Sequence, residues 1–202
     1  MKLIKKILPG IALGTAALLS ISSQAAELII DGSGKLVGAN EVMVDGALYN
    51  VQLVDGTCID LYQGCDNINN FVFDTQAKAV AASQALFDQV LINLPAPNTF
   101  DDDPEKLQGC TNSGICRVMT PYGFSLDLTQ VLGATADNNQ FEIDDVITPN
   151  IAVADSTDFA GISLATYAVW LPLAVTVPIP GAIALLPMLL LIGHLAKARS
   201  TA

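Results

Sequence analysis

The stretch Val42-Met-Val-Asp-Gly-Ala-Leu-Tyr-Asn-Val-Gln-Leu-Val54 gives the clearest indication of fold in this 202-residue chain. Asp45-Gly46 separates two runs that are rich in β-branched and other apolar residues. An Asp-Gly pair between two such runs is typical of a type I′ turn, whose twist matches that of a hairpin. Asp55-Gly56 then ends the second run. We therefore predict an antiparallel hairpin closed by Asp45-Gly46.

Other short runs on both sides of this hairpin have strand composition. Residues 117–120 and 124–128 are predicted to form a second hairpin, with its turn at 121–123. Further strands are predicted at residues 28–30, 71–73 and 162–170, and an imperfect alternation runs over 140–147.

One segment has the composition of a helix. Residues 75–91 are rich in alanine and other good helix formers, and Asp74 or Thr75 can cap the N-terminus. Five residues fall close to one helical face: Val80, Ser83, Phe87, Val90 and Leu91. We expect this face to pack on a sheet, with a partner-binding helix as the alternative. The predicted fold is a single small α+β domain, mainly antiparallel sheet with one packed helix.

The N-terminus has the composition of a secretory signal. Lys2, Lys5 and Lys6 precede an uncharged segment at residues 7–21 that is rich in Leu, Ile and Ala. Small residues at Ser23 and Ala25 then fit the small-x-small cleavage pattern. Residues 1–25 are therefore interpreted as a signal peptide removed by signal peptidase, with a retained N-terminal anchor as the alternative.

The C-terminus has the composition of a membrane anchor. No charged residue lies between Asp158 and Lys197. Pro178 and Pro180 prevent a regular helix across them, but a helix can begin at Gly181. Residues 181–196 would then span about 24 Å as a transmembrane helix, which is short but sufficient for a thin membrane. The sequence thus divides into a signal (1–25), an exported domain (26–170) and a tail (171–202).

The tail also resembles a known sorting signal. Val177-Pro178-Ile179-Pro180-Gly181, an apolar segment and a basic end at Lys197 and Arg199 are similar to a PEP-CTERM signal of the VPLPA type. Such tails occur on exported proteins of Gram-negative bacteria that make exopolysaccharide, and an exosortase is held to process them. The resemblance implies anchoring in the inner membrane with a periplasmic domain, then sorting to the cell surface or extracellular matrix. A plain membrane anchor is the alternative.

The exported domain is strongly acidic. All twenty acids of the chain lie in residues 26–170, against four bases, which leaves a formal charge of −16. Nucleic acid is excluded as a partner, because phosphate contacts need clustered Lys and Arg. The charge keeps the domain soluble, and it could also attract divalent cations or basic partners.

Four cysteines lie in this domain: Cys58, Cys65, Cys110 and Cys116. Export makes disulfides the expected state, and three pairings are possible. We predict Cys58–Cys65 and Cys110–Cys116, because each pair closes a short loop that contains glycine. The spacings are longer than those common in zinc sites and no histidine accompanies them, which makes a metal site the weaker interpretation.

The exported domain lacks the residues that most catalytic mechanisms need. The only histidine, His194, lies in the tail, so the domain has no His-based catalytic triad and no histidine metal ligand. Paired carboxylates could still hydrolyse a glycosidic bond, with Asp127, Glu142, Asp144 and Asp145 as candidates.

Calcium is the one cofactor for which the sequence offers ligands. Two acidic segments gather hard oxygen donors, which Ca²⁺ prefers. The candidates are Asp101, Asp102, Asp103, Asp137, Asn139, Glu142, Asp144 and Asp145. Neither segment has EF-hand spacing, and solvated acidic loops are the alternative.

The sequence therefore predicts an exported, envelope-anchored protein without enzymatic activity, structural or adhesive in role. The resemblance links it to exopolysaccharide or biofilm matrix. A polysaccharide hydrolase and a calcium-dependent adhesion module are the two alternatives.

Overall fold

A computed structural model describes residues 25–174, and in that range seven strands form one sheet in the order β1-β2-β3-β7-β4-β5-β6. All neighbouring strands are antiparallel except β4 and β7, which are parallel. The strands are β1 (Glu27–Ile30), β2 (Leu36–Val44), β3 (Ala47–Val54), β4 (Ile115–Phe124), β5 (Gln130–Asn139), β6 (Val146–Ala154) and β7 (Ala165–Pro172). With one long helix against this sheet, the predicted α+β domain is confirmed.

The hairpin at Asp45-Gly46 is confirmed. Val44 pairs with Ala47 across the turn. Asp45 and Gly46 both have positive φ, 47° and 82°. A type I′ turn requires positive φ at both central residues, which is why the Asp-Gly signal is so direct.

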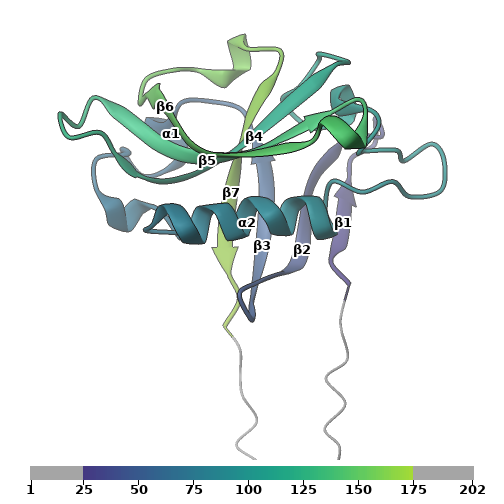
Figure 1. Ribbon diagram of the computed structural model, residues 1–202, viewed down its shortest axis with the longest axis horizontal. Coiled ribbons are helices and arrows are strands. Elements are labelled where there is room, and N and C mark those ends of the chain that lie inside the picture. The colour runs from purple at the N-terminus through teal and green to yellow at the C-terminus, as the bar shows by residue number, and fades with distance from the viewer. Residues whose placement is uncertain (1–24, 175–202) are drawn as a thin grey trace, which may run out of the picture.

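Helix α2 (Gln76–Gln89) lies across the strongly curved sheet, with β4, β5 and β6 on one side and β1, β2 and β3 on the other (Figure 1). Thr75 is the N-cap, and its side chain accepts a hydrogen bond from the Lys78 amide. Of the predicted face, Ser83, Val90 and Leu91 are buried, whereas Val80 and Phe87 are only partly buried. Further small residues also face the sheet and let the helix approach it closely: Ala79, Ala82 and Ala85, together with Leu86.

The sheet has a hydrophobic core on each face, because successive strand residues point to opposite sides. On β4, for example, Val118 belongs to the core under α2 and Met119 to the core on the other face. The helix-side core is largely aliphatic and includes Val51, Leu86 and Leu107. The second core is rich in aromatic rings and contains Tyr62, Phe71, Phe159 and Tyr167.

Loops and the short helix α1 (Cys58–Leu61) cover the second core. The Tyr62 hydroxyl donates to the Ala168 carbonyl on β7 at 2.9 Å, which ties this cover to the centre of the sheet. The Cys58–Cys65 disulfide lies in the same core.

Two strand predictions differ from the structure. Residues 71–73 form no strand: Phe71 is buried in the second core and Phe73 in the first, so the segment passes from one face of the sheet to the other. Strand β4 continues through Pro121, where a turn was predicted, and the turn follows at residues 125–129. Pairing of β4 with β7 ends at Met119, so the missing amide of Pro121 interrupts no bond on that side.

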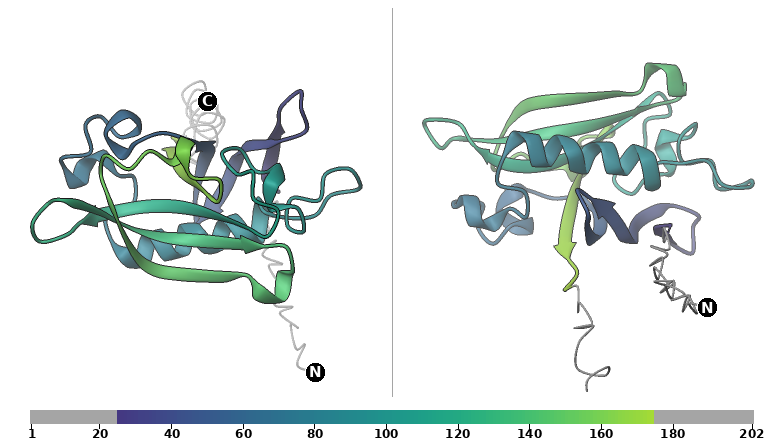
Figure 2. Two further views of the ribbon diagram at one scale, coloured as in Figure 1. Left: turned by 90° about the horizontal axis from the view of Figure 1, so that it is seen from above. Right: turned by 60° about the horizontal axis from the view of Figure 1, so that its bottom comes forward.

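The two ends of the described chain lie at the same pole of the domain. Strand β1 begins there and β7 ends there, with β2 and β3 between them in the sheet (Figures 1 and 2). The predicted signal peptide, sorting motif, transmembrane helix and basic tail lie outside the described residues. Between residues 25 and 174, no helix combines the length and the apolar character needed to cross a bilayer.

Candidate functional site

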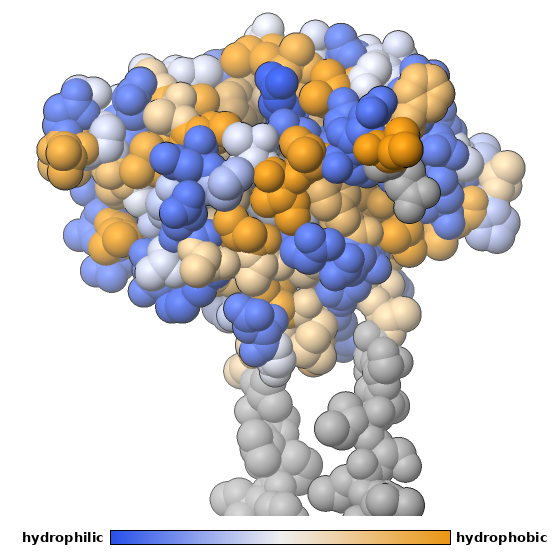
Figure 3. All heavy atoms as spheres, in the orientation of Figure 1, coloured by the Kyte–Doolittle hydropathy of each residue, from blue (hydrophilic) through white to orange (hydrophobic). Residues whose placement is uncertain are grey.

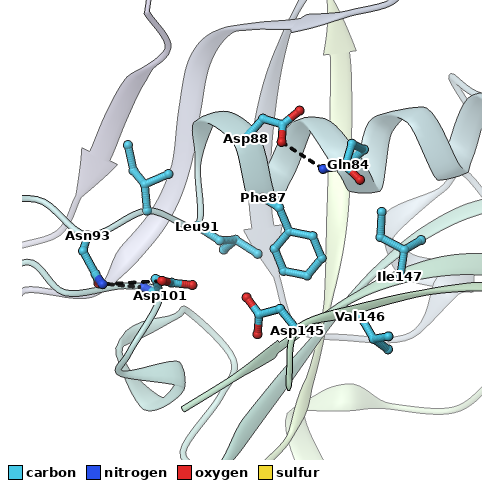
Figure 4. A pocket seen from close by; sticks show the side chains of 10 residues that line it. Gln84, Phe87, Asp88, Leu91, Asn93, Asp101, Asp145, Val146 and Ile147 are labelled. Atoms are coloured by element: carbon cyan, nitrogen blue, oxygen red, sulfur yellow. Dashed lines mark hydrogen bonds between the residues drawn. The ribbon is translucent and has the colours of Figure 1, made fainter. Parts of the chain in front are cut away.

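An acidic cleft of about 780 Å³ lies where the C-terminal half of α2, the loop after it and the start of β6 meet. Both apolar and polar side chains line it (Figure 4). The apolar ones are Phe87, Leu91, Ile92, Val146 and Ile147, and the polar ones are Gln84, Asp88, Asn93, Asp101 and Asp145. We call this set the acidic cleft.

The helix supplies one wall of the acidic cleft. Phe87 and Asp88 follow each other on α2, and the Phe87 ring points from the helix into the cavity (Figure 4). The Asp88 carboxylate accepts a hydrogen bond from Gln84 Nε2, one helical turn earlier, at 2.8 Å. The partly exposed Phe87, which the sequence assigned to the packed face, is therefore available to a ligand.

Asn93 organises the loop wall. Its Oδ1 accepts from the amides of Asp101 and Asp102 at 3.2 and 3.3 Å. Its Nδ2 donates to the Asp102 carboxylate at 2.9 Å. One side chain thus closes residues 93–102 into a loop and places Asp101 in the lining of the cleft.

The third wall is held by the turn between β5 and β6. Asp145 Oδ1 accepts from the Asn139 amide at 2.6 Å, and Asn139 Nδ2 donates to the carbonyls of Asp137 and Asp144 at 3.0 and 2.7 Å. These bonds fix Asp145 just before β6, with its carboxylate toward Phe87 and Leu91 (Figure 4).

Three carboxylates and no Lys, Arg or His line the acidic cleft. The cleft therefore favours ligands that donate hydrogen bonds or carry positive charge. Hydrophobic side chains are visible between polar ones along the band where α2 meets the β5–β6 edge of the sheet (Figure 3). The site combines an apolar contact surface with acceptors around it.

The calcium candidates do not come together as a set. Asp101 and Asp145 share the acidic cleft, but Asp103 forms an ion pair with Lys106 at 2.6 Å. The Lys106 and Thr99 side chains bound to Asp103 lower the pKa of its carboxyl. In the described range no group of three or more His, Cys, Asp or Glu side chains is arranged to hold a metal ion.

Asp137 belongs to a different environment. It lies on β5 opposite Arg117 of β4, and the Asp137 Oδ2 to Arg117 Nε distance is 3.5 Å. Thr148 also donates to Asp137 Oδ2, at 3.2 Å. This carboxylate is thus engaged by neighbouring strands and does not line the acidic cleft.

The hydrolase candidates are also dispersed. Asp127 lies in the β4–β5 turn, where Ser125 Oγ donates to it at 2.5 Å and lowers its pKa. Asp145 follows the other end of the ten-residue strand β5, about 30 Å away at the usual rise per residue. Asp144 is exposed in the short 3-10 segment Glu142–Asp144. The carboxylates that do share a cavity are Asp88, Asp101 and Asp145.

The cysteines pair as the loop lengths predicted. Cys58 bonds Cys65 and Cys110 bonds Cys116, with Cα–Cα distances of 5.6 and 5.8 Å. Both are buried, one pair in each core. Two disulfides indicate folding in an oxidising compartment.

Sequence reasoning missed Gln84, Phe87, Asp88 and Asn93 as parts of a site. The one available signal was an asparagine four residues after the end of α2 and eight residues before an acidic run. Asparagine side chains often bond nearby backbone amides in turns, as Asn93 does here. The other three lie on α2, where Phe87 was assigned to the packed face and is only partly buried.

Comparisons with known proteins add no further constraint: no family model, curated protein or solved structure matches this chain.

Proposed function

We propose that this protein is an exported, envelope-anchored binding protein that displays the acidic cleft outside the cytoplasmic membrane and has no enzymatic activity. The observation that carries the proposal is the position of the chain ends, which lie at one pole of a domain stabilised by two disulfides. A chain that enters and leaves at one pole can be held there while its other surfaces stay free.

The strand order supports this form of display. Strand β7, which leads to the C-terminal segment, is the middle strand of the sheet and pairs with β3 and β4. A tail that anchors the protein would hold the domain by its centre. The acidic cleft borders β6, at the opposite edge of the sheet from β1.

The cleft fits a saccharide of the surrounding matrix as its ligand. Ligand sites combine an apolar or aromatic surface with a few placed polar groups. Here the Phe87 ring offers a surface for the apolar face of a sugar ring, and the carboxylates accept hydrogen bonds from hydroxyls. This agrees with the link to exopolysaccharide that the tail resemblance implies.

Anchoring is tested by recovering the protein from its native cells. Cell fractionation, thiol alkylation without reductant and mass spectrometry of the intact protein report location, cysteine state and termini together. We expect envelope or surface material that begins at Ala26 and has no free thiol. Full-length protein with free thiols in the cytosol would overturn the proposal.

Saccharide binding is tested with the exopolysaccharide purified from the same cells. We expect Phe87→Ala and Asp101→Asn to weaken binding at least tenfold, measured by affinity electrophoresis or calorimetry. Asp127→Asn is the matched control, because this carboxylate lies at the far end of β5. Equal binding by all variants, or no binding by the native protein, would refute the cleft as a saccharide site.

A glycoside hydrolase is the second candidate, because Asp101 and Asp145 line the same cavity. Such enzymes place two carboxyl groups on either side of the scissile bond. New reducing ends released from the purified polysaccharide, and lost in both Asp101→Asn and Asp145→Asn, would establish that activity in place of simple binding.

A further inference from the structure

The acidic cleft carries a negative charge that no base in its lining offsets. Asp88, Asp101 and Asp145 line it, and none of its ten lining residues is a Lys, Arg or His. The four Lys and Arg residues of the range 25–174 make their contacts elsewhere: Lys78 with Asp74, Lys106 with Asp103, Arg117 with Asp137, and Lys35 with the Cys110 carbonyl. A ligand that enters the cleft therefore meets an excess of negative charge.

An aromatic ring, independent of these charges, also points to a ligand. Phe87 is only partly buried, although it directly follows the fully buried Leu86 on α2, and its ring points into the cavity (Figure 4). Leu91 and Ile147 extend the apolar surface of the cleft. The cavity volume of about 780 Å³ lies within the range of about 300–1,000 Å³ that is usual for small-molecule sites, so a short oligosaccharide fits.

We propose that the ligand of the acidic cleft is a saccharide with free amino groups, whose sugar ring packs on Phe87 and whose ammonium groups bind the surrounding carboxylates. This inference rests on the saccharide binding proposed above and narrows its substrate class. Asp88, Asp101 and Asp145 lie on different sides of the Phe87 ring in the view of Figure 4, and they come from α2, the loop after it and the position before β6. Ammonium groups on successive sugars would thus find acceptors on more than one side of the cleft.

Charge discriminates between amino sugars and other sugars. A hydrogen bond between an ammonium group and a carboxylate is about twice as strong as one between neutral groups. A neutral or N-acetylated sugar can donate hydrogen bonds from its hydroxyls, but it leaves the charge of the cleft uncompensated. A uronic acid would bring a further carboxylate to a domain with twenty acids and four bases, which repels it.

Binding is tested on the full chain held in nanodiscs of zwitterionic lipid, so that the lipid surface does not attract a cationic ligand. Calorimetric titrations would compare a glucosamine tetramer, an N-acetylglucosamine tetramer and tetralysine, with empty nanodiscs as the reference. A weakly acidic buffer keeps the amino groups protonated. We expect the glucosamine tetramer to bind at least about tenfold more tightly than each of the other two, and to bind more weakly as salt is added.

The outcomes separate this inference from the proposed function. Equal binding of the two sugar tetramers would overturn the amino-sugar assignment and leave saccharide binding in place. Equal binding of tetralysine would overturn it in favour of a basic peptide, because the cleft would then select charge alone. If neither tetramer binds but the exopolysaccharide from the native cells does, the assignment fails and the proposed function stands. If the exopolysaccharide does not bind either, both fail.

Variants locate the binding. Asp88→Asn and Asp145→Asn each remove one charge and keep an oxygen that can accept from Gln84 and from the Asn139 amide, respectively. Each should weaken binding of the glucosamine tetramer about tenfold and leave that of the N-acetylglucosamine tetramer nearly unchanged. Asp127→Asn removes the same charge at the far end of β5 and should change neither. Unchanged affinity for the glucosamine tetramer in both cleft variants would place it elsewhere and refute the assignment.

Discussion

The two faces of the sheet are covered in different ways. On one face α2 lies close to the strands through alanines and Leu86, and the core there is largely aliphatic. On the other face loops form the cover, and large rings fill the space, with Phe159 stacked on Tyr167 at 4.3 Å between ring centroids. A helix satisfies its own backbone and presents a regular surface, whereas loops leave irregular space. Each core contains one disulfide, and the loop-covered face also has a mainly apolar cavity of about 220 Å³.

The largest effect is expected under the helix. Leu86→Ala removes a fully buried side chain from α2. Because the rigid helix cannot collapse into the space, the free energy of unfolding should fall by about 3 kcal/mol. Denaturant unfolding of the purified protein measures this. Gln84→Ala, an exposed position on the same helix, should change it far less, and similar losses in both would argue that α2 is not packed on the sheet.

The next largest loss of stability is expected from removing the Cys58–Cys65 disulfide on the loop-covered face. Replacing Cys58 and Cys65 by serine opens a seven-residue link and should cost about 2 kcal/mol on the chain-entropy model. Hydrogen exchange should show the loss of protection around α1 and Tyr62 and little change in α2. Uniform deprotection of both faces would show instead that the two covers unfold as one unit.

A smaller effect, the dependence of folding stability on pH, also distinguishes the two faces of the sheet. Burial raises the pKa of Tyr62 well above its usual value near 10 and also raises that of Tyr167, both in the second core. The folded state therefore keeps protons that the unfolded state loses, and stability should be constant below pH 10 and fall above it. Tyr62→Phe should cost about 1 kcal/mol at neutral pH through the lost bond to Ala168 and should reduce the alkaline decline. If Tyr62→Phe left the alkaline decline in stability unchanged, that decline could not be assigned to the buried Tyr62 hydroxyl.

The smallest effect concerns calcium. Asp103 and Asp137 are engaged by Lys106 and Arg117, and the carboxylates of the acidic cleft form no metal-binding group within the described range. Millimolar Ca²⁺ should therefore leave the melting temperature nearly unchanged, because a ligand stabilises only when its concentration exceeds its dissociation constant. A rise of several degrees that is lost in Asp145→Asn would restore the calcium hypothesis.

Local signals in the sequence predicted the elements that depend on local physics. The Asp45-Gly46 turn, the helix cap at Thr75 and the short disulfide loops are each set by residues close in sequence. The strand predicted at residues 71–73 failed for the opposite reason. Alternating burial there arises from two cores on opposite sides of a sheet, and no strand pairs with the segment.

The candidate site was less accessible to prediction than the fold. Asp101 and Asp145 lie 44 positions apart, and they share a cleft only because α2 and β6 come together. Most of β6 was also missed, because the alternation over residues 140–147 reaches only its first two residues, the rest of the strand is largely exposed, and Pro149 interrupts it. An edge strand that faces solvent has little hydrophobic periodicity to detect.

The position of β7 has a consequence for assembly. Tyr49 pairs with Pro172, so the strand that joins β1–β3 to β4–β6 is the last one to be synthesised. Without it, the two three-stranded halves have open edges at β3 and β4, and no strand pairing in the described residues joins them. Such distant pairing slows folding, and the complete sheet can therefore form only after Pro172 has been synthesised.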